Sequence, residues 1–203
     1  MSNVRLLVAT HNPGKEREFR CLLAPLGAQL CFPSEIGLEI EVPEDGATYA
    51  DNATQKALAY ARTSGMLTLA DDSGLEVDAL DGAPAIRSAR YTPGSDSDRV
   101  KALLRQLHDV PWERRTARFR CVVIIVTPAQ QLYSAEGSCE GLIALEPQGE
   151  GGFGYDPVFY LPEYGCTMAQ LSQAEKNRIS HRARAIEAAM PALRRLLSRP
   201  EPG

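Results

Sequence analysis

The sequence predicts an α/β fold in which a mixed sheet is flanked by helices. Residues 4–9 form an apolar run that ends in turn residues, and residues 15–26 then show helical spacing. This order of strand, turn and helix is the usual opening of an α/β protein. Residues 118–127 and 131–145 are two long alternating segments joined by a short turn, a pattern typical of an antiparallel hairpin. Strand–helix units followed by antiparallel strands favour a mixed sheet.

The first half of the chain continues this alternation of strands and helices. Residues 48–64 have helical spacing, with Thr48 or Asp51 as the cap. An apolar strand at residues 66–70 runs directly into Asp71-Asp72-Ser73-Gly74, which we therefore place at a strand end. Two further elements are expected, a strand at residues 29–32 and a helix at residues 97–108.

The second half is predicted to complete the sheet and to end in a long helix. Residues 149–157 are a glycine-rich loop that precedes a strand at residues 158–161. A helix should run from about residue 172 to Leu197, and Pro191 should kink or break it near Ala189 because proline lacks an amide hydrogen. The first strand of the hairpin has one apolar face, formed by Phe119, Cys121, Val123 and Ile125.

The composition describes an ordinary globular protein of 203 residues, which we expect to form one domain or a two-lobed domain. The formal charge of -4 argues against binding a nucleic-acid polymer, which needs a basic face. No apolar run approaches the roughly 20 residues of a membrane span, and the five cysteines lack metal-ligand spacing. Since we find no signal peptide, we expect a cytoplasmic protein with a flexible tail at residues 199–203.

Lys15 stands out because the chain has only four lysines among its 22 basic residues. It ends the turn Thr10-His11-Asn12-Pro13-Gly14-Lys15, where backbone amides at a helix N-terminus would face an anion. A compact ammonium at this position suits a terminal phosphate. The turn lacks the upstream glycine and the following Ser or Thr of a P-loop, so a Walker-type NTPase is disfavoured. The alternative is that this turn is a plain connection between a strand and a helix. For Lys56, the alternative is that its retention as lysine is due to chance.

The adjacent carboxylates Asp71 and Asp72 form a second candidate site. Side chains of neighbouring strand residues point to opposite faces, so we expect one aspartate to be structural and the other to face a site. Carboxylate oxygens suit Mg2+, which retains waters and binds substrate phosphates. A second acidic cluster could add a ligand or could be a solvated turn, and its members are Glu39, Glu41, Glu44 and Asp45.

Two later stretches have the character of a nucleotide site. In the glycine-rich loop, Phe153 and Tyr155 offer flat faces on which a base could stack, and Asp156 can accept from a ring N–H. A plain hairpin connection would not require this pair of aromatics. The stretch at residues 172–182 opens with a capping box. It should place Lys176, Ser180 and His181 on one flank of the helix, where a solvated face would need neither Ser nor His.

Together these stretches resemble the inosine/xanthosine triphosphate pyrophosphatase family, also called the Ham1-like family, over about residues 4–197. The resemblance implies an elongated α/β homodimer with an active-site cleft between two lobes. It also implies Mg2+-dependent hydrolysis of ITP, dITP and XTP to the monophosphate and pyrophosphate, which removes these purine nucleotides from the nucleotide pool. The matching motifs are, in order, THNPGK, ADDSGLEVDALDGAPAIRSARY, EGGFGYDPVF and LSQAEKNRISHRARA.

The resemblance also suggests roles for individual residues. Asp72 matches the family's proton acceptor and metal-linked aspartate, and Glu44 matches a second magnesium-associated acid less securely. Asp71 is a third candidate metal ligand, and His11 departs from a glycine that is common in the family. The candidate substrate-binding residues are Thr10, His11, Asn12, Pro13, Gly14, Lys15, Ser73, Phe153, Gly154, Tyr155, Asp156, Lys176, His181 and Arg182.

Base selection would follow from the polarity of hydrogen bonds. Hypoxanthine and xanthine present an O6 acceptor and an N1 donor, so Arg182 or His181 could donate to O6 and Asp156 could accept from N1–H. Adenine reverses both groups and would leave buried polar groups unpaired. Two alternative functions remain at this point. One is a nucleotide-binding regulatory module without hydrolysis, and the other is a pyrophosphatase that prefers pyrimidine or modified nucleotides.

Overall fold

The computed structural model describes residues 5–198 and confirms the α/β class. The strands form a mixed sheet in the order β2-β1-β3-β4-β5-β6-β7. Strand β1 pairs in parallel with β2 and β3, whereas β6 pairs antiparallel with β5 and β7. Val4 and the tail predicted at residues 199–203 lie outside the described residues. The strands are β1 (Arg5–Val8), β2 (Gln29–Cys31), β3 (Leu67–Val77), β4 (Thr116–Val126), β5 (Leu132–Ile143), β6 (Phe159–Leu161) and β7 (Cys166–Thr167).

The helices cover the apolar faces of these strands. They are α1 (Pro13–Leu23), α2 (Tyr49–Ser64), α3 (Asp96–Gln106), α4 (Gln173–Ile179) and α5 (His181–Leu197). The chain divides into two compact units, and the division falls inside β3, after Asp72. Unit 1 comprises Met1–Asp72, Cys121–Gly137 and Arg182–Gly203, and unit 2 comprises Ser73–Arg120 and Ser138–His181.

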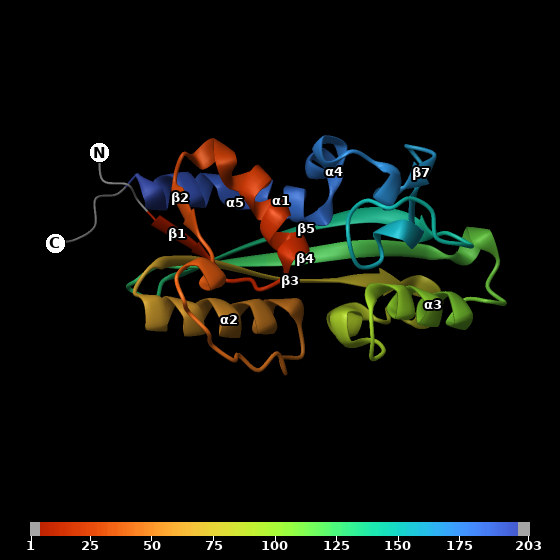
Figure 1. Cartoon of the computed structure of the whole chain (residues 1–203), viewed down its shortest axis with the longest axis horizontal. Coiled ribbons are helices and arrows are strands. Elements are labelled where there is room, and N and C mark those ends of the chain that lie inside the picture. The colour runs from red at the N-terminus through yellow and green to blue at the C-terminus, as the bar shows by residue number, and fades with distance from the viewer. Residues whose placement is uncertain (1–4, 199–203) are drawn as a thin grey trace. The chain divides into compact units, whose positions relative to one another are not determined.

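Unit 1 has three layers. Helices α1 and α5 lie on one face of its strands and α2 lies on the other (Figure 1). The core on the α1 and α5 side includes alternate residues of β3 and β4, as the predicted strand periodicity requires. These core residues include Leu67, Leu69, Cys121, Val123 and Ile125. On the opposite side, α2 buries a stripe formed by Ala53, Ala57, Tyr60 and Ala61.

The helix starts follow from capping residues in the sequence. Asn12 caps α1 through its side-chain oxygen, so the helix begins at Pro13, two residues earlier than predicted. Proline is tolerated there because the first helical amide has no partner within the helix. Thr48 and Asp51 form a capping box at the start of α2. The amide of Asp51 donates to the Thr48 hydroxyl, and the amide of Thr48 donates to the Asp51 carboxylate. The predicted capping box of Ser172 with Glu175 is confirmed at α4.

The C-terminal helix predicted as one element is instead two. Helix α4 ends at Ile179 because Ser180 is extended, with φ -64° and ψ 154°, and α5 begins at His181. The predicted break near Ala189 is wrong, since Pro191 lies inside α5. Buried residues before and after the proline, Ile186 and Leu193, hold this helix in the core. Lys176 and His181 therefore belong to separate helices.

The two adjacent aspartates lie within a strand, not at its end as predicted. Strand β3 extends to Val77, but the pairing of β1 with β3 ends where Val8 meets Leu69. Asp71 and Asp72 therefore lie just beyond the last residue of β1. At this point α1 begins, so its first side chains can approach a strand that β1 no longer covers.

Unit 2 forms its core from strand and loop residues, with α3 packed against them. Leu75, Val77 and Phe119 of the strands contribute to it. Tyr155 of the glycine-rich loop also belongs to this core and is 4% exposed. The short strand β7, which was not predicted, pairs with β6 through Thr167 and Tyr160. Within residues 5–198, no helix is both long enough and apolar enough to cross a membrane.

Candidate active site

The turn between β1 and α1 is held by its own side chains. Asn12 Oδ1 accepts hydrogen bonds from the amides of Gly14 at 2.8 Å and Lys15 at 3.0 Å. The amide of Asn12 in turn donates to Thr10 Oγ1 at 3.2 Å. Two amides that we expected to face a phosphate are therefore bonded to the capping side chain. The ammonium of Lys15, and not the helix amides alone, becomes the main attraction for an anion.

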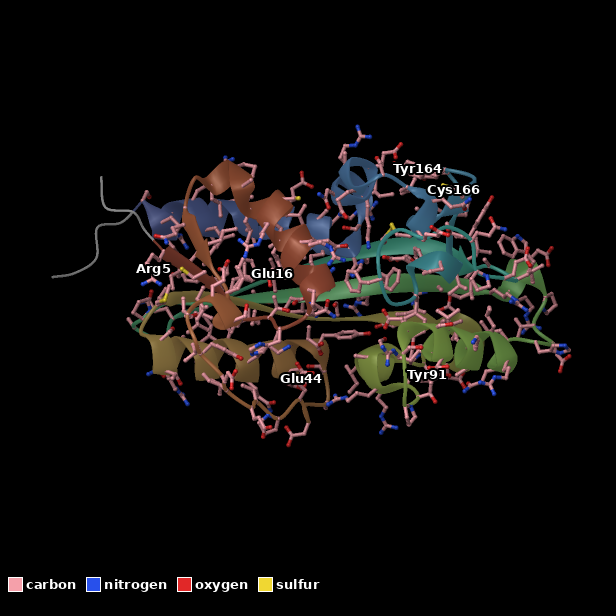
Figure 2. The ribbon with its side chains drawn as sticks, viewed as in Figure 1. Arg5, Glu16, Glu44, Tyr91, Tyr164 and Cys166 are labelled. Carbon is pink, nitrogen blue, oxygen red and sulfur yellow. The ribbon has the colours of Figure 1, made fainter. Side chains whose placement is uncertain are left out.

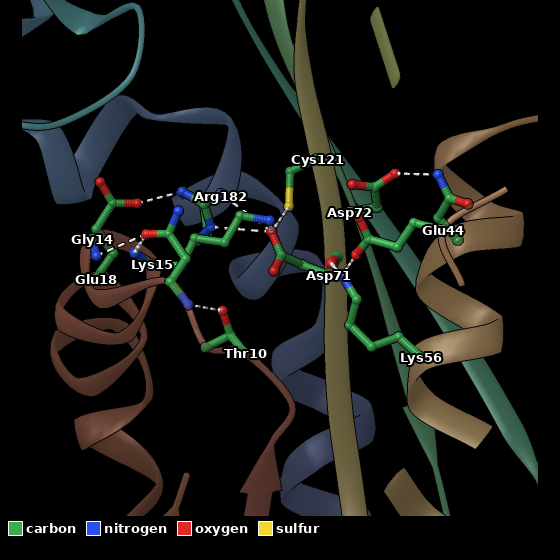
Figure 3. Close-up of polar contacts among 12 residues, drawn as sticks. Thr10, Gly14, Lys15, Glu18, Glu44, Lys56, Asp71, Asp72, Cys121 and Arg182 are labelled. Atoms are coloured by element: carbon green, nitrogen blue, oxygen red, sulfur yellow. Dashed lines mark hydrogen bonds and ion pairs between the residues drawn. The ribbon is translucent and has the colours of Figure 1, made fainter. Parts of the chain in front are cut away.

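Asp71 lies at the centre of a buried ion cluster. Its Oδ2 meets Lys15 Nζ at 2.9 Å and Arg182 Nη2 at 3.2 Å, and Arg182 also pairs with Glu18 (Figure 3). Burial alone would raise the pKa of Asp71, but the charges of Lys15 and Arg182 outweigh it and hold the pKa below the usual range. This arrangement favours an electrostatic role for Asp71 over the metal ligation expected from the sequence.

Arg182 has a different environment from the one expected of a base-binding residue. It is 1% exposed, and its guanidinium is shared between the carboxylates of Glu18 and Asp71. Burial would lower the pKa of Arg182, but Asp71 and Glu18 raise it, so the residue stays charged. Contact with a base stays a prediction for Arg182. Arg182 would have to make this contact while it also bonds to the carboxylates of Glu18 and Asp71.

Asp72 points to the other side of β3, toward α2 (Figure 3). Its Oδ2 accepts a hydrogen bond at 2.9 Å from the side-chain amide of Asn52. Burial raises the pKa of Asp72 above its usual value, against the opposing effects of Asn52 and Lys15. The amide is neutral, so this bond orients the carboxylate without cancelling its charge. The two aspartates thus point to opposite faces of β3, as strand geometry predicts.

Glu44 lies beside α2 (Figure 2) and forms an ion pair with Lys56. Lys56 Nζ also donates to the carbonyl oxygen of Asp71 at 3.2 Å. Burial would lower the pKa of Lys56, but Asp71 and Glu44 raise it above the usual value. Lys56 and Asn52 were not among the predicted site residues. The rarity of lysine in the chain was the available signal for Lys56, whereas nothing in the sequence singled out Asn52.

The donor chemistry of this region is compatible with Mg2+. Asp72 and Glu44 provide carboxylate oxygens, the ligand type that Mg2+ prefers, and phosphates and water usually complete its coordination. Asp72 suits this role because Asn52 orients its carboxylate. Within residues 5–198, no group of three or more His, Cys, Asp or Glu side chains could hold a metal ion by itself. The proposed ion would therefore need ligands from phosphate and water as well.

In unit 2, the glycine-rich loop is tied down by two carboxylates. Asp156 accepts from the amide of Phe153 at 2.8 Å and pairs with Lys176, while Asp96 accepts from the amide of Gly154 at 2.8 Å. Gly152 has φ +72°, and a Cβ there would lie 1.9 Å from Asp156 Oδ2. Glycine is required at this position because no side chain fits. Asp96 was missed, since its contact joins residues 58 apart.

The aromatic residues of this region do not share one role. Phe153 is half-buried, and Lys176 Nζ lies 4.8 Å from the centre of its ring. Tyr155 is buried instead of exposed as a stacking surface, because its hydroxyl donates to the carbonyl of Ser88 at 3.0 Å. His181 stacks on Phe119 with ring centres 4.7 Å apart. A base could therefore stack on Phe153 but not on Tyr155, and Ser73 is half-buried in β3.

Comparison with known proteins places these features in one family. The model of the Ham1 family matches residues 6–192. The chain belongs to the Ham1 family. A Ham1 protein from Coxiella burnetii superposes with a TM-score of 0.84 at 36% identity, covering 94% of this chain and 98% of that one. A Mycobacterium abscessus structure described as a nucleoside-triphosphatase, or dITP/XTP pyrophosphatase, has a TM-score of 0.74 at 41% identity, covering 93% and 100%.

Curated relatives of this Ham1 chain have related names. A protein of Desulforamulus reducens named dITP/XTP pyrophosphatase is 53% identical over 195 residues, which cover 95% of this chain and 97% of that protein. A Bacillus subtilis protein with the same name is 44% identical, covering 89% of this chain and 92% of the relative. These similarities confirm the family resemblance expected from the four sequence motifs.

Proposed function

We propose that this chain hydrolyses the non-standard purine nucleotides ITP, dITP and XTP to the monophosphate and pyrophosphate. The observation that carries the proposal is the difference between the surroundings of the adjacent aspartates Asp71 and Asp72. Asp71 pairs with Lys15 and Arg182, whereas Asp72 lies on the other side of β3 and is oriented by Asn52. A general base beside a cationic phosphate contact is the pair of groups that this reaction requires. The names of the curated relatives support the same substrates.

In the proposed reaction, water attacks the α-phosphorus and the bond to the bridging oxygen of pyrophosphate breaks. Asp72 orients the water and accepts its proton. Lys15 lies 2.9 Å from Asp71 and would transfer part of its interaction to the triphosphate, where it stabilises negative charge on the leaving group. Lys56, held between Glu44 and the Asp71 carbonyl, adds a second cation on the α2 side. Positioning and electrostatics provide most of the rate, and no covalent enzyme intermediate is needed.

Mg2+ is the cofactor that we propose, with Asp72 and Glu44 as its protein ligands. When bound, the ion would withdraw charge from the phosphate oxygens. Activity should therefore disappear in EDTA, return with excess Mg2+ and rise toward alkaline pH. Because burial raises the pKa of Asp72, the acid limb of the profile should lie above that of an ordinary aspartate. Pyrophosphate release across pH and Mg2+ concentration measures both effects, and full turnover in EDTA would remove Mg2+ from the proposal.

Base selection is assigned to unit 2. Phe153 offers a stacking face, and Lys176 places a cationic donor beside its ring. Such a donor suits the O6 acceptor of hypoxanthine or xanthine and opposes the 6-amino group of adenine. Asp156 holds Lys176 in place through their ion pair, so its effect on base choice would be exerted through that lysine.

ITP, dITP and XTP should exceed ATP and GTP in kcat/KM by at least about 10²-fold, because unpaired buried polar groups are costly. Lys15→Ala should lower the rates with all substrates by a similar factor, since each carries the same triphosphate. A panel of these nucleotides and the pyrimidine triphosphates, assayed for pyrophosphate release, checks both statements. ATP hydrolysis equal to ITP hydrolysis would contradict the proposed specificity. A pyrimidine preference, or binding without any hydrolysis, would favour the alternative functions.

Assembly and location are also proposals. The family resemblance leads us to propose a homodimer that works in the cytoplasm. Sedimentation equilibrium of the purified protein would report the mass of the assembly. A monomer that retains full activity would exclude a catalytic need for the dimer.

A further inference from the structure

One face of α2 carries polar side chains that reach different parts of the proposed site. Asn52, Lys56 and Tyr60 are spaced four residues apart, so they lie in a row along the helix. Asn52 orients Asp72 and Lys56 pairs with Glu44. Tyr60 continues the row, yet the proposed mechanism has given it no role.

The hydroxyl of Tyr60 joins two segments that are separate in the sequence. It donates to the carbonyl of Ile40 at 3.4 Å and lies 2.7 Å from His11 Nε2. The contact with His11 is the shorter of the two, and the tautomer of the imidazole sets which group donates. Tyr60 is 2% exposed and its ring is packed in unit 1, which fixes the position of the hydroxyl.

One partner of this hydroxyl, His11, belongs to the proposed triphosphate site, and the other, Ile40, precedes the proposed metal ligand Glu44. His11 lies within the turn at residues 10–15, between the Thr10 and Asn12 side chains that shape it. Ile40 lies four residues before Glu44, in a segment without helix or strand. Tyr60 therefore connects the phosphate turn on one side with the acidic segment on the other. Packing of the ring alone would not require contacts to both.

We propose that Tyr60 is a positioning residue for triphosphate binding, acting through His11. It holds the imidazole in one orientation, and thereby the turn that presents Lys15 to phosphate groups. This inference rests on the proposed function, in that residues 10–15 are taken to bind the triphosphate. It extends that function to a tyrosine that does not itself touch the substrate.

The variant Tyr60→Phe tests this role because it removes the hydroxyl and keeps the ring. We expect KM for ITP to rise about 3- to 10-fold, the usual effect of one hydrogen bond, with kcat within about twofold. Binding of inorganic tripolyphosphate in EDTA, measured by calorimetry, should weaken by a similar factor. In the double variant with His11→Gly, the two effects should not add, since one acts through the other.

Tyr133→Phe is the matched control, because its hydroxyl contacts Gln131 at 3.4 Å, outside the proposed site. It should leave KM and tripolyphosphate binding unchanged. A purely structural role for Tyr60 would lower the melting temperature of Tyr60→Phe without changing KM or tripolyphosphate affinity, and that result would overturn the inference. Additive effects with His11→Gly would overturn it as well.

The tripolyphosphate experiment separates this inference from the proposed function. The probe has no base, so an incorrect nucleotide preference would leave its binding unaffected. Loss of tripolyphosphate affinity in Tyr60→Phe would support the positioning role even if ITP proved to be a poor substrate. Absence of tripolyphosphate binding by the unaltered protein in EDTA would overturn the inference but not the proposed function, which requires Mg2+.

Discussion

The variant Asp72→Asn should lose at least about 10²-fold in kcat for ITP while remaining folded. Asparagine can still accept the hydrogen bond of Asn52 but cannot take a proton from water or provide a full negative charge to a metal. Burial raises the pKa of Asp72, which means that the folded state disfavours its ionised form. The stability contributed by this residue therefore falls as pH rises through that pKa, and the variant should melt at the same temperature as the unaltered protein or higher at pH 7.

Asp109→Asn provides the matched control, because this aspartate side chain is 97% exposed and lies outside the proposed site. Its kcat should stay within twofold of the unaltered protein. Steady-state pyrophosphate release and thermal denaturation of both variants complete the comparison. If Asp72→Asn retains more than half of the activity, Asp72 is not the base.

The second large effect concerns stability. Asp71→Asn should lower the free energy of unfolding by about 3–5 kcal/mol at pH 7, because it leaves the buried charge of Arg182 with fewer partners. The folded pKa of Asp71 is lowered, so its stabilising contribution is complete above the unfolded pKa of about 3.9 and declines as pH falls below it. The difference between the two proteins should therefore shrink in acid.

Urea denaturation at pH 7 and at pH 3 measures this difference. Glu16→Gln is the control, since the pair of Glu16 with Arg20 is exposed and should contribute no more than about 1 kcal/mol. An Asp71→Asn protein as stable as the control would mean that the ion cluster does not support the fold. It follows that Arg182→Ala tests base recognition only if the variant is first shown to be folded.

Local patterns in the sequence were enough to predict most of the elements. The alternation in β4 and the capping box of α4 were predicted correctly because each depends on neighbours within a few residues. The opposed directions of Asp71 and Asp72 also follow from strand geometry alone. The break at Ser180 was missed because Pro191 was the stronger local signal, and packing on both sides of the proline kept α5 intact.

The partners of the site residues could not be predicted in the same way. Arg182 contacts Asp71 across 111 positions and Glu18 across 164, and no local pattern encodes such a meeting. Tyr155 was expected to offer the face of its ring to a base. In the structure it is buried, and its hydroxyl donates to the carbonyl of Ser88, which lies 67 residues away.

The row of polar side chains on α2 has a consequence for insertions and deletions. An α-helix turns by about 100° per residue, so one residue added before Asn52 would swing all three side chains away from their partners together. The helix is capped at both ends, by Thr48 at its start and by Gly65 at its end. These caps oppose a shift of the helix by one residue that could restore the contacts. A change of length in α2 should thus be far more harmful than most single substitutions on its outer side. The same change at the exposed residues 128–130, in the turn between β4 and β5, would not rotate the side chains of α2.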